Sequence, residues 1–249
     1  MIYVCSDVHG YAERFYKMLD TIQLAETDTL YILGDIIDRN PDGIELLKYV
    51  MEKDNIVLLM GNHEDFMYSY LVNLNVLGRL DEKENFPKNI WLSDNNGGKV
   101  TLERFAEEDL PSKKEILSYL SNLPLIVLLE VNGTKFHLSH AGTIPQVLGK
   151  DVWYVSDVNK YEREYITWHC PYRSDCYLSK CDYPVDYVSI IGHVPVERIN
   201  HDGSFSFIRD DNIINIDSGC SMYSLENTAG IKTALSCLRL DDMKAFYVH

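Results

Sequence analysis

Three polar segments in the first 64 residues each follow a short apolar run and contain side chains that can bind metal ions. They are Asp-Val-His-Gly at 7–10, Gly-Asp-Ile-Ile-Asp-Arg at 34–39 and Gly-Asn-His-Glu at 61–64. The spacing is nearly constant, with 28 residues from Asp7 to Asp35 and 27 from Asp35 to Asn62. Carboxylate, imidazole and amide groups are common ligands of divalent metals. The sequence therefore predicts a metal centre assembled from three similar loops.

Two later histidines extend this set: His140 in Ser-His-Ala-Gly and His193 in Ile-Gly-His. The six candidate ligands are then Asp7, His9, Asp35, Asn62, His140 and His193. Such a mixed nitrogen and oxygen set suits two divalent ions about 3.5–4 Å apart that share one carboxylate. Asp35 is the expected bridge because it lies in the middle motif. The absence of cysteine argues against structural zinc. Mn is the expected metal, with Fe and Zn as alternatives that the ligand types do not exclude.

Each of these residues has an ordinary explanation when it is considered alone. An Asp at a strand end is often a helix N-cap, a His is often a partly buried side chain, and an Asn is often a turn residue. The joint pattern favours the metal centre, because all three loops place a glycine beside a candidate ligand and glycine permits close backbone approach.

The first 76 residues alternate strand and helix signals. Apolar runs at 2–5, 30–33 and 56–60 predict strands, and helical spacing of apolar residues follows each of them, at 11–24, 41–50 and 66–74. This alternation predicts parallel strands joined by right-handed crossovers. Ligands of such sheets bind just outside the carboxyl ends of the strands, which is where the three motifs fall.

The remainder of the chain changes character at residue 78. Residues 78–122 are charged, with helical patterns at 99–107 and 113–120, and we interpret them as a cap inserted over the site or as helices that cover a sheet edge. Strands are predicted at 125–131, 135–139, 188–191, 213–216, 234–240 and 245–248, the first two joined by an Asn-Gly turn. Residues 150–186 show no clear periodicity. The length of 249 residues suits one domain, 1–249.

Composition limits the partners. The chain has 38 Asp and Glu against 23 Lys and Arg, a net charge of −15, which disfavours nucleic acid as a partner. A small phosphate ester or a protein with a basic docking region fits better, although the acidity also serves solubility. No signal-peptide pattern or membrane-spanning apolar stretch is seen, so we expect a cytoplasmic location without a membrane partner. The six cysteines have irregular spacing and do not predict a disulfide framework.

The combined motifs Asp-x-His-Gly, Gly-Asp-x-x-Asp-Arg, Gly-Asn-His-Glu, His-Ala-Gly and Gly-His resemble those of the calcineurin-like metallophosphoesterases. More narrowly, they are similar to the phosphoprotein phosphatase family and its bacterial and phage members. The resemblance implies an α/β metallophosphoesterase fold of four layers, in which two mixed β-sheets form a sandwich flanked by helices. It also implies that Asp7 and His9 bind the first metal, that Asp35 bridges, and that Asn62, His140 and His193 bind the second.

The chemistry expected of such a site is hydrolysis by a hydroxide that bridges two metals. The departing oxygen needs a proton, and we predict that His63 supplies it and that Asp38 orients His63. The alternatives for His63 are a seventh metal ligand or a loop hydrogen bond. Arg39 is expected to grip the phosphate, because its guanidinium matches two phosphate oxygens, rather than to form a surface ion pair. Glu64 is assigned no chemistry beyond favouring the start of the following helix.

One segment departs from the family. Its bacterial and phage members carry a second phosphate-binding arginine in a Trp-x-Arg arrangement, whereas Cys170 stands in that place here and Arg173 follows three residues later. We predict that Arg173 takes over this role. Cys170, Cys176 and Cys181 lack the short paired spacing of zinc motifs, so free thiols in a surface loop are expected.

Three functions are considered. The first is hydrolysis of phosphoserine and phosphothreonine monoesters in proteins, slightly favoured by Glu64 because dinucleotide hydrolases with these motifs tend to have Asp there. The second is symmetric hydrolysis of dinucleoside polyphosphates such as diadenosine tetraphosphate. The third is a non-catalytic binding module, which the complete ligand set disfavours. The sequence leaves the substrate, the native metals and the oligomeric state open.

Overall fold

The computed structural model describes residues 1–75, 90–172, 179–200, 204–222 and 232–249. Its first sheet has five strands in the order β11-β10-β1-β2-β3. They are β1 (Ile2–Cys5), β2 (Thr29–Ile32), β3 (Ile56–Leu58), β10 (Leu235–Arg239) and β11 (Lys244–Val248). β1, β2 and β3 are parallel, and β10 and β11 add an antiparallel pair. The predicted parallel strands at 2–5, 30–33 and 56–60 are therefore confirmed within two residues at each end.

The second sheet has six strands in the order β6-β4-β5-β7-β9-β8. They are β4 (Pro124–Val131), β5 (Thr134–Ser139), β6 (Val152–Tyr154), β7 (Val188–Ile191), β8 (Ile208–Asp210) and β9 (Ile213–Asn215). The β4–β5 hairpin turns at Asn132 and Gly133, both with positive φ, and β5, β7 and β9 are parallel. The Asn-Gly signal thus predicted a hairpin correctly.

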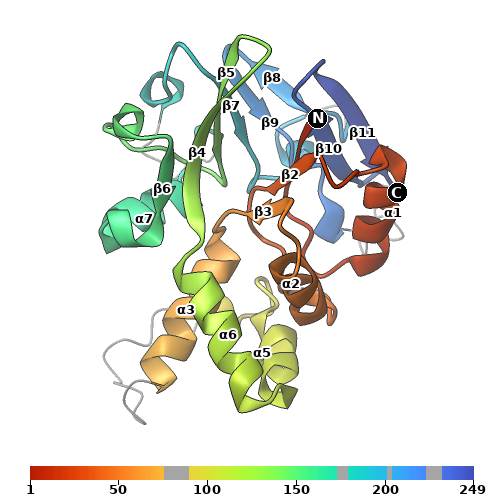
Figure 1. Cartoon of the computed structure of the whole chain (residues 1–249), viewed down its shortest axis with the longest axis vertical. Coiled ribbons are helices and arrows are strands. Elements are labelled where there is room, and N and C mark those ends of the chain that lie inside the picture. Colours follow the sequence, from red (N-terminus) through yellow and green to blue (C-terminus); the bar gives the residue numbers. More distant parts are fainter. Residues whose placement is uncertain (76–89, 173–178, 201–203, 223–231) are drawn as a thin grey trace.

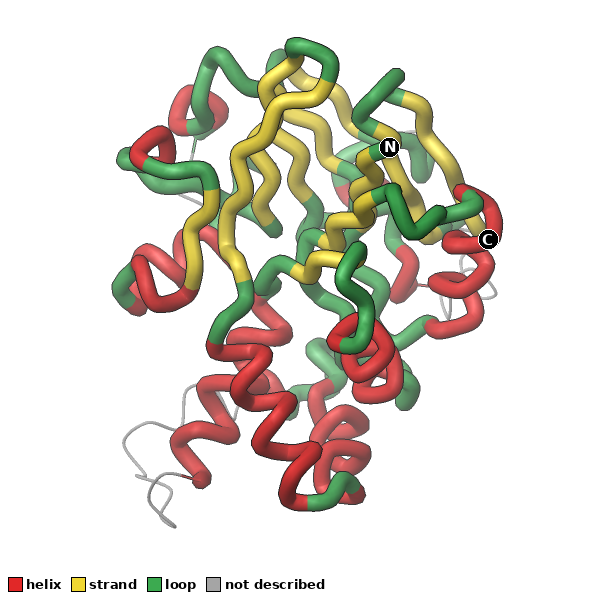
Figure 2. Tube along the Cα trace, in the orientation of Figure 1, coloured by secondary structure: helices red, strands yellow, loops and turns green. Residues whose placement is uncertain are grey.

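The two sheets face each other across one apolar layer. Val4 and Leu238 of the first sheet pack in one buried cluster with Val127, Phe136 and Ile190 of the second. All five side chains are almost fully buried. Alternating side chains on each strand supply this layer, because successive residues of a strand point to opposite faces. Figure 2 shows the strands gathered in one half of the molecule. The expected sandwich of two mixed sheets flanked by helices is confirmed.

Six α-helices are described. They are α1 (Ala12–Ile22), α2 (Gly43–Met51), α3 (Asn62–Asn75), α5 (Gly98–Glu107), α6 (Leu110–Ser121) and α7 (Lys160–Trp168). Short 3-10 turns occupy Val147–Gly149, Val155–Asp157, Lys180–Asp182, Val196–Arg198 and Cys220–Met222. α1 packs on β10 and β11 through its buried Phe15, Met18 and Ile22 (Figure 1). None of the described helices is long and apolar enough to cross a membrane.

α3, α5 and α6 form a helical layer beyond the carboxyl ends of the first sheet's parallel strands (Figure 1). α5 and α6 match the helical patterns predicted at 99–107 and 113–120. α6 begins at Asp109, whose side chain accepts a hydrogen bond from the Ser112 N–H at 2.8 Å, with Pro111 in the first turn. The single-domain boundary and the cap role of 78–122 stay predictions.

The region 150–186, which showed no periodicity in sequence, contains β6, α7 and two 3-10 turns in its described parts. α7 begins with a capping box in which Asn159 accepts from the Glu162 N–H at 3.1 Å and Glu162 accepts from the Asn159 N–H at 2.9 Å. The Asn-x-x-Glu spacing is a recognisable signal for the start of a helix, and apolar periodicity alone does not reveal it.

Candidate metal centre and active site

The six predicted ligands lie at the carboxyl ends of five strands that belong to both sheets. Asp7 and His9 follow β1, Asp35 follows β2, Asn62 follows β3, His140 follows β5 and His193 follows β7. All but His193 are almost fully buried. Because parallel strands end at the same edge, the fold brings residues that are far apart in sequence to one place.

Asp35 lies at the middle of the group. Its Oδ2 is 3.6 Å from Nε2 of His9 and 3.5 Å from Nε2 of His140. Asp35 belongs both to a group with His9 and His63 and to a group with His140 and His193, and ligand atoms within each group lie within 4.8 Å of one another. Two clusters that share one carboxylate fit a dinuclear metal centre in which that carboxylate bridges.

Hydrogen bonds to backbone carbonyls orient two of the imidazoles. His9 Nδ1 lies 3.0 Å from the Ile37 carbonyl oxygen, and His140 Nδ1 lies 2.6 Å from that of Leu33. A carbonyl only accepts, so Nδ1 carries the proton and Nε2 faces Asp35 with its lone pair. Burial lowers the pKa of His9 well below its usual value, which keeps the ring neutral. These are the protonation state and orientation that a metal ligand requires, so the residues fit the expected metals.

Asp7 is held from two sides. Its Oδ2 accepts hydrogen bonds from the Ser6 hydroxyl and from the His193 N–H at 3.0 Å. Its Oδ1 lies 4.0 Å from His9 Nε2, toward the centre. The expected ligands of the second metal lie still closer together. His140 Nε2 is 3.0 Å from Asn62 Oδ1 and 3.2 Å from His193 Nδ1.

The site concentrates unusual backbone conformations. Ten non-glycine residues have positive φ in the described part of the chain, and six of them are predicted site residues: Asp7, His9, Asp35, Asp38, Arg39 and His193. The left-handed region is unfavourable for residues with a Cβ, and such strain persists where surrounding structure enforces it. The strained backbone of these loops thus directs several side chains toward one point.

His63 and Asp38 are paired beside this centre. His63 Nδ1 lies 2.6 Å from Asp38 Oδ2, and both side chains are buried. Burial lowers the pKa of His63 and raises the pKa of Asp38, because low-dielectric surroundings disfavour the charged form of each group. His63 Nε2 lies 3.8 Å from Asp35 Oδ2, which also allows a seventh-ligand role. The general-acid role stays a prediction.

Trp91 was missed by the sequence analysis as a site residue. Its Nε1–H donates to Asp38 Oδ2 at 2.7 Å, and the ring is completely buried. A Cβ on Gly98 would come within 2.5 Å of Trp91 Nε1, so this glycine is needed for the packing of α5 against the ring. A tryptophan within a charged, weakly patterned segment was the available signal.

Arg39 is exposed at the mouth of the site. One guanidinium nitrogen lies 3.5 Å from His63 Nε2, and another bonds the Ser221 hydroxyl. This position beside His63 Nε2 suits the predicted contact with a phosphate oxygen. Arg173, the predicted second phosphate ligand, lies outside the described residues.

Glu64 has a more specific role than the sequence suggested. Its carboxylate accepts N–H hydrogen bonds from both the Asp35 loop and the Asn62 loop: Asp35 at 2.7 Å, Ile36 at 2.9 Å, Gly61 at 3.0 Å and Ile37 at 3.4 Å. The side chain is completely buried, and burial raises its pKa. Glu64 therefore fastens two metal-binding loops together. The interpretation that Glu64 only favours the start of the following helix was incomplete.

The cysteine expectation needs a correction. Cys170 is completely buried against Ala141, Tyr183 and Ile191 and does not lie in an exposed loop. The apolar surroundings explain why a thiol stands there, since free cysteine behaves as a small hydrophobic residue. It forms no disulfide bond, as expected. Cys176 and the side chain of Cys181 lie outside the described part.

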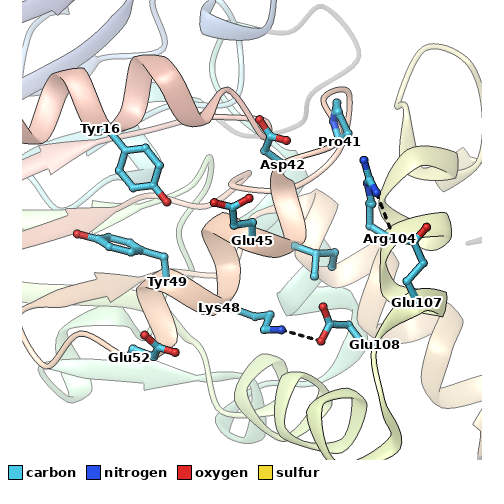
Figure 3. A pocket seen from close by; sticks show the side chains of 11 residues that line it. Tyr16, Pro41, Asp42, Glu45, Lys48, Tyr49, Glu52, Arg104, Glu107 and Glu108 are labelled. Carbon is cyan, nitrogen blue, oxygen red and sulfur yellow. Dashed lines mark hydrogen bonds and ion pairs between the residues drawn. The ribbon is translucent and has the colours of Figure 1, made fainter.

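A separate hollow of about 550 Å³ lies between α2 and α5, away from the ligands (Figure 3). Its two basic side chains are already paired, Lys48 with Glu108 at 2.7 Å and Arg104 with Glu107 at 3.1 Å. The remaining charged side chains that line it are acidic, including Glu45. A phosphate would be repelled there, so this hollow does not extend the metal centre.

Comparison with known proteins agrees with this geometry. The family model described as calcineurin-like phosphoesterase matches residues 1–214. The chain belongs to this family. The family resemblance inferred from the motifs is therefore confirmed at this level, and the described residues include His and Asp clusters that could hold metal ions.

Two bacterial relatives carry the name symmetrical bis(5'-nucleosyl)-tetraphosphatase. The protein of Erwinia tasmaniensis is 30% identical over 146 residues, which are 58% of this chain and 45% of that protein. The protein of Proteus mirabilis is 27% identical over 195 residues, 78% of this chain and 58% of that protein. The chain thus spans about half the length of the curated relatives it matches.

Solved structures support the fold. One assigned provisionally as a diadenosine tetraphosphatase has a TM-score of 0.63 and 15% identity, with 99% of this chain and 92% of that chain covered. A protein serine/threonine phosphatase from Saccharomyces cerevisiae has a TM-score of 0.52 and 12% identity, covering 99% and 78%. At these identities the likeness concerns the fold alone.

Proposed function

We propose that this chain is a metal-dependent hydrolase of dinucleoside polyphosphates that releases two nucleotides. The observation that carries the chemistry is the shared carboxylate of Asp35, 3.6 Å from His9 Nε2 and 3.5 Å from His140 Nε2, flanked by the His63–Asp38 pair. The substrate class is taken from the relatives named symmetrical bis(5'-nucleosyl)-tetraphosphatase.

The residues of this chain have different roles in the proposed reaction. Asp7, His9, Asp35, Asn62, His140 and His193 would hold two divalent cations, with Mn proposed first. The cations, when bound, would polarise the phosphate and lower the pKa of a water for attack. Arg39 holds a phosphate oxygen at the mouth of the site. His63 carries a proton at Nε2 for the departing oxygen, and Asp38 keeps the ring in that orientation through Nδ1.

The sequence argument for the protein-phosphatase hypothesis does not hold. It drew on Glu64, yet this side chain is buried and bonds only backbone N–H groups of the two loops in the described structure. A residue that does not face substrate carries no information about which substrate binds. Phosphoserine and phosphothreonine peptides therefore serve as the competing arm of the test.

The test uses Mn-loaded protein with diadenosine tetraphosphate, a phosphothreonine peptide and p-nitrophenyl phosphate. The proposal expects ADP as the main nucleotide product, with kcat/KM for the dinucleotide at least tenfold above that for the peptide. Turnover of the peptide without the dinucleotide would replace the proposal by a protein phosphatase. No turnover of any substrate, with metals bound, would favour a binding module.

A further inference from the structure

A small hollow of about 150 Å³ opens directly beside the ligand Asn62. Phe66 of α3, Trp168 of α7 and Ile90 supply its apolar side chains, and the other lining side chains of α3 and α7 are polar or charged. A volume of about 150 Å³ is large enough for a single benzene ring. We call this feature the aromatic hollow. Its size and lining suit a flat ring.

Aromatic rings connect the aromatic hollow to both sides of the metal centre. The ring centroids of His63 and Phe66 are 6.2 Å apart, and those of Phe66 and Trp168 are 5.7 Å apart. Trp168 in turn lies 5.3 Å from the ligand His193. A molecule whose phosphate lies at the centre therefore has ring faces within reach of its adjoining group.

The charges of the aromatic hollow compensate one another. Arg163 Nε lies 3.0 Å from Asp65 Oδ1, and Ser69 bonds both partners, at 3.2 Å to Asp65 and 3.4 Å from Arg163. At the exposed rim, Lys160 faces the solvent together with Glu164. A second phosphate or a cation would gain little net attraction here. A neutral aromatic group that stacks and uses the polar rim for hydrogen bonds fits better.

We propose that the aromatic hollow receives a nucleobase of the substrate while the polyphosphate lies at the metal centre. This inference rests on the proposed function, because it is that function which supplies a nucleoside on the phosphate chain. Stacking on Phe66 and Trp168 is tolerant of base identity, since every base has a flat π-face. The aromatic hollow would thus distinguish nucleotides from simple phosphate esters more strongly than it distinguishes adenine from guanine.

The experiment separates base recognition from dinucleotide turnover. Mn-loaded protein is assayed with glycerol 2-phosphate, a substrate without rings, and the reaction is followed by glycerol release. ADP and methyl diphosphate are compared as inhibitors, because they share the diphosphate monoester and differ in the nucleoside. We expect ADP to inhibit about tenfold more strongly, the size typical of one base stacking on an aromatic side chain.

Two variants locate the effect. Phe66→Leu keeps an apolar, helix-compatible side chain but removes the ring, and should reduce the advantage of ADP to within about twofold while inhibition by methyl diphosphate is unchanged. Tyr161→Leu is the matched control, because Tyr161 is 82% exposed on the same helix as Trp168 and outside the aromatic hollow. It should retain the full advantage.

The outcomes are distinct. Equal inhibition by ADP and methyl diphosphate in the unsubstituted protein, which needs no variant, overturns the inference. A Phe66→Leu variant that weakens inhibition by ADP and by methyl diphosphate equally also overturns the inference, since the ring would then act on the metal centre and not on the base. If ADP keeps its Phe66-dependent advantage but diadenosine tetraphosphate is not hydrolysed, the nucleobase site stands and the proposed function falls.

Discussion

His63 and Trp91 bind the same oxygen of Asp38, at 2.6 Å through His63 Nδ1 and at 2.7 Å through the indole N–H. One carboxylate oxygen thus connects the candidate proton donor to a buried ring from the segment predicted as a cap. The orientation of His63 depends in part on residues beyond its own loop. A small shift of that segment would be transmitted through Asp38 to the His63 ring.

Substitution of His63 by Asn separates its two possible roles. As a general acid, His63 contributes about 10²–10⁴-fold to turnover, so His63→Asn should lower kcat by that factor with two metals still bound. Metal content by mass spectrometry and kcat are measured on the same sample. Loss of one metal would instead assign His63 as a ligand. His249→Asn, a change at the far end of the chain, is the matched control.

Trp91→Phe removes one hydrogen bond while keeping an aromatic ring. The lost N–H leaves Asp38 less stabilised as a carboxylate, which should cost about 1–3 kcal/mol of stability. The Trp91 hydrogen bond lowers the pKa of Asp38 against the larger effect of burial, so its removal raises that pKa further. The acidic limb of the kcat profile should therefore move to higher pH. An unchanged profile would contradict coupling between Trp91 and the acid pair.

Glu64→Gln places an amide N–H₂ against backbone N–H donors. Each carboxylate oxygen accepts two of the four hydrogen bonds, so two of them are replaced by donor–donor contacts. We therefore expect a loss of about 2–3 kcal/mol in the free energy of unfolding and weaker metal binding. Glu64→Asp retains both oxygens on a shorter stem and should fall between. Urea denaturation and metal titration test this. A Gln variant with full metal affinity would show that the two loops hold together without Glu64.

His137 offers a stability test away from the metal centre. Its ring nitrogens are buried without a hydrogen-bond partner among the described residues, and burial lowers its pKa to about 3. Because the folded pKa is depressed, the unfolded chain takes up a proton first, and stability is lost as pH falls from about 6.5 toward 3.

His137→Leu should therefore be neutral or stabilising at pH 7.5, and its advantage over the unsubstituted protein should grow by about 2 kcal/mol at pH 5. Free energies of unfolding at the two pH values, measured without metal, check this. An advantage that does not change with pH would mean that His137 is protonated in the folded state. The side chain of His137 is itself completely buried in β5, so an apolar leucine suits this position.

Motifs with regular spacing were predictable from the sequence. The loops after β1, β2 and β3 were located from apolar runs followed by Asp, His or Asn, and the structure brings Asp7, Asp35 and Asn62 to one edge of the sheet. Local signals are sufficient there, because strand direction fixes where the loops meet.

Contacts that depend on distant segments were not predictable in the same way. The bond between Trp91 and Asp38 joins residues 53 positions apart, and no periodicity reports it. The burial of Cys170 depends in part on packing against Ala141 and Ile191, which lie outside the 150–186 region. The strand Ile208–Asp210 is short and mixed in polarity, so it forms only because β9 lies beside it.

The division of the ligands between two sheets has a mechanical consequence. Asp7 and Asp35 follow strands of the first sheet, whereas His140 and His193 follow strands of the second, so bound cations would join the two sheets at one end of the sandwich. The opposite end is held by apolar packing and by hydrogen bonds such as the one from Asn132 to the Asp241 carbonyl oxygen. A chelator would remove the cations and with them this connection between the sheets. We then expect amide hydrogens near His140 and His193 to exchange faster than those at the other end of β5. Metal availability would then set how readily this protein opens, and from which end.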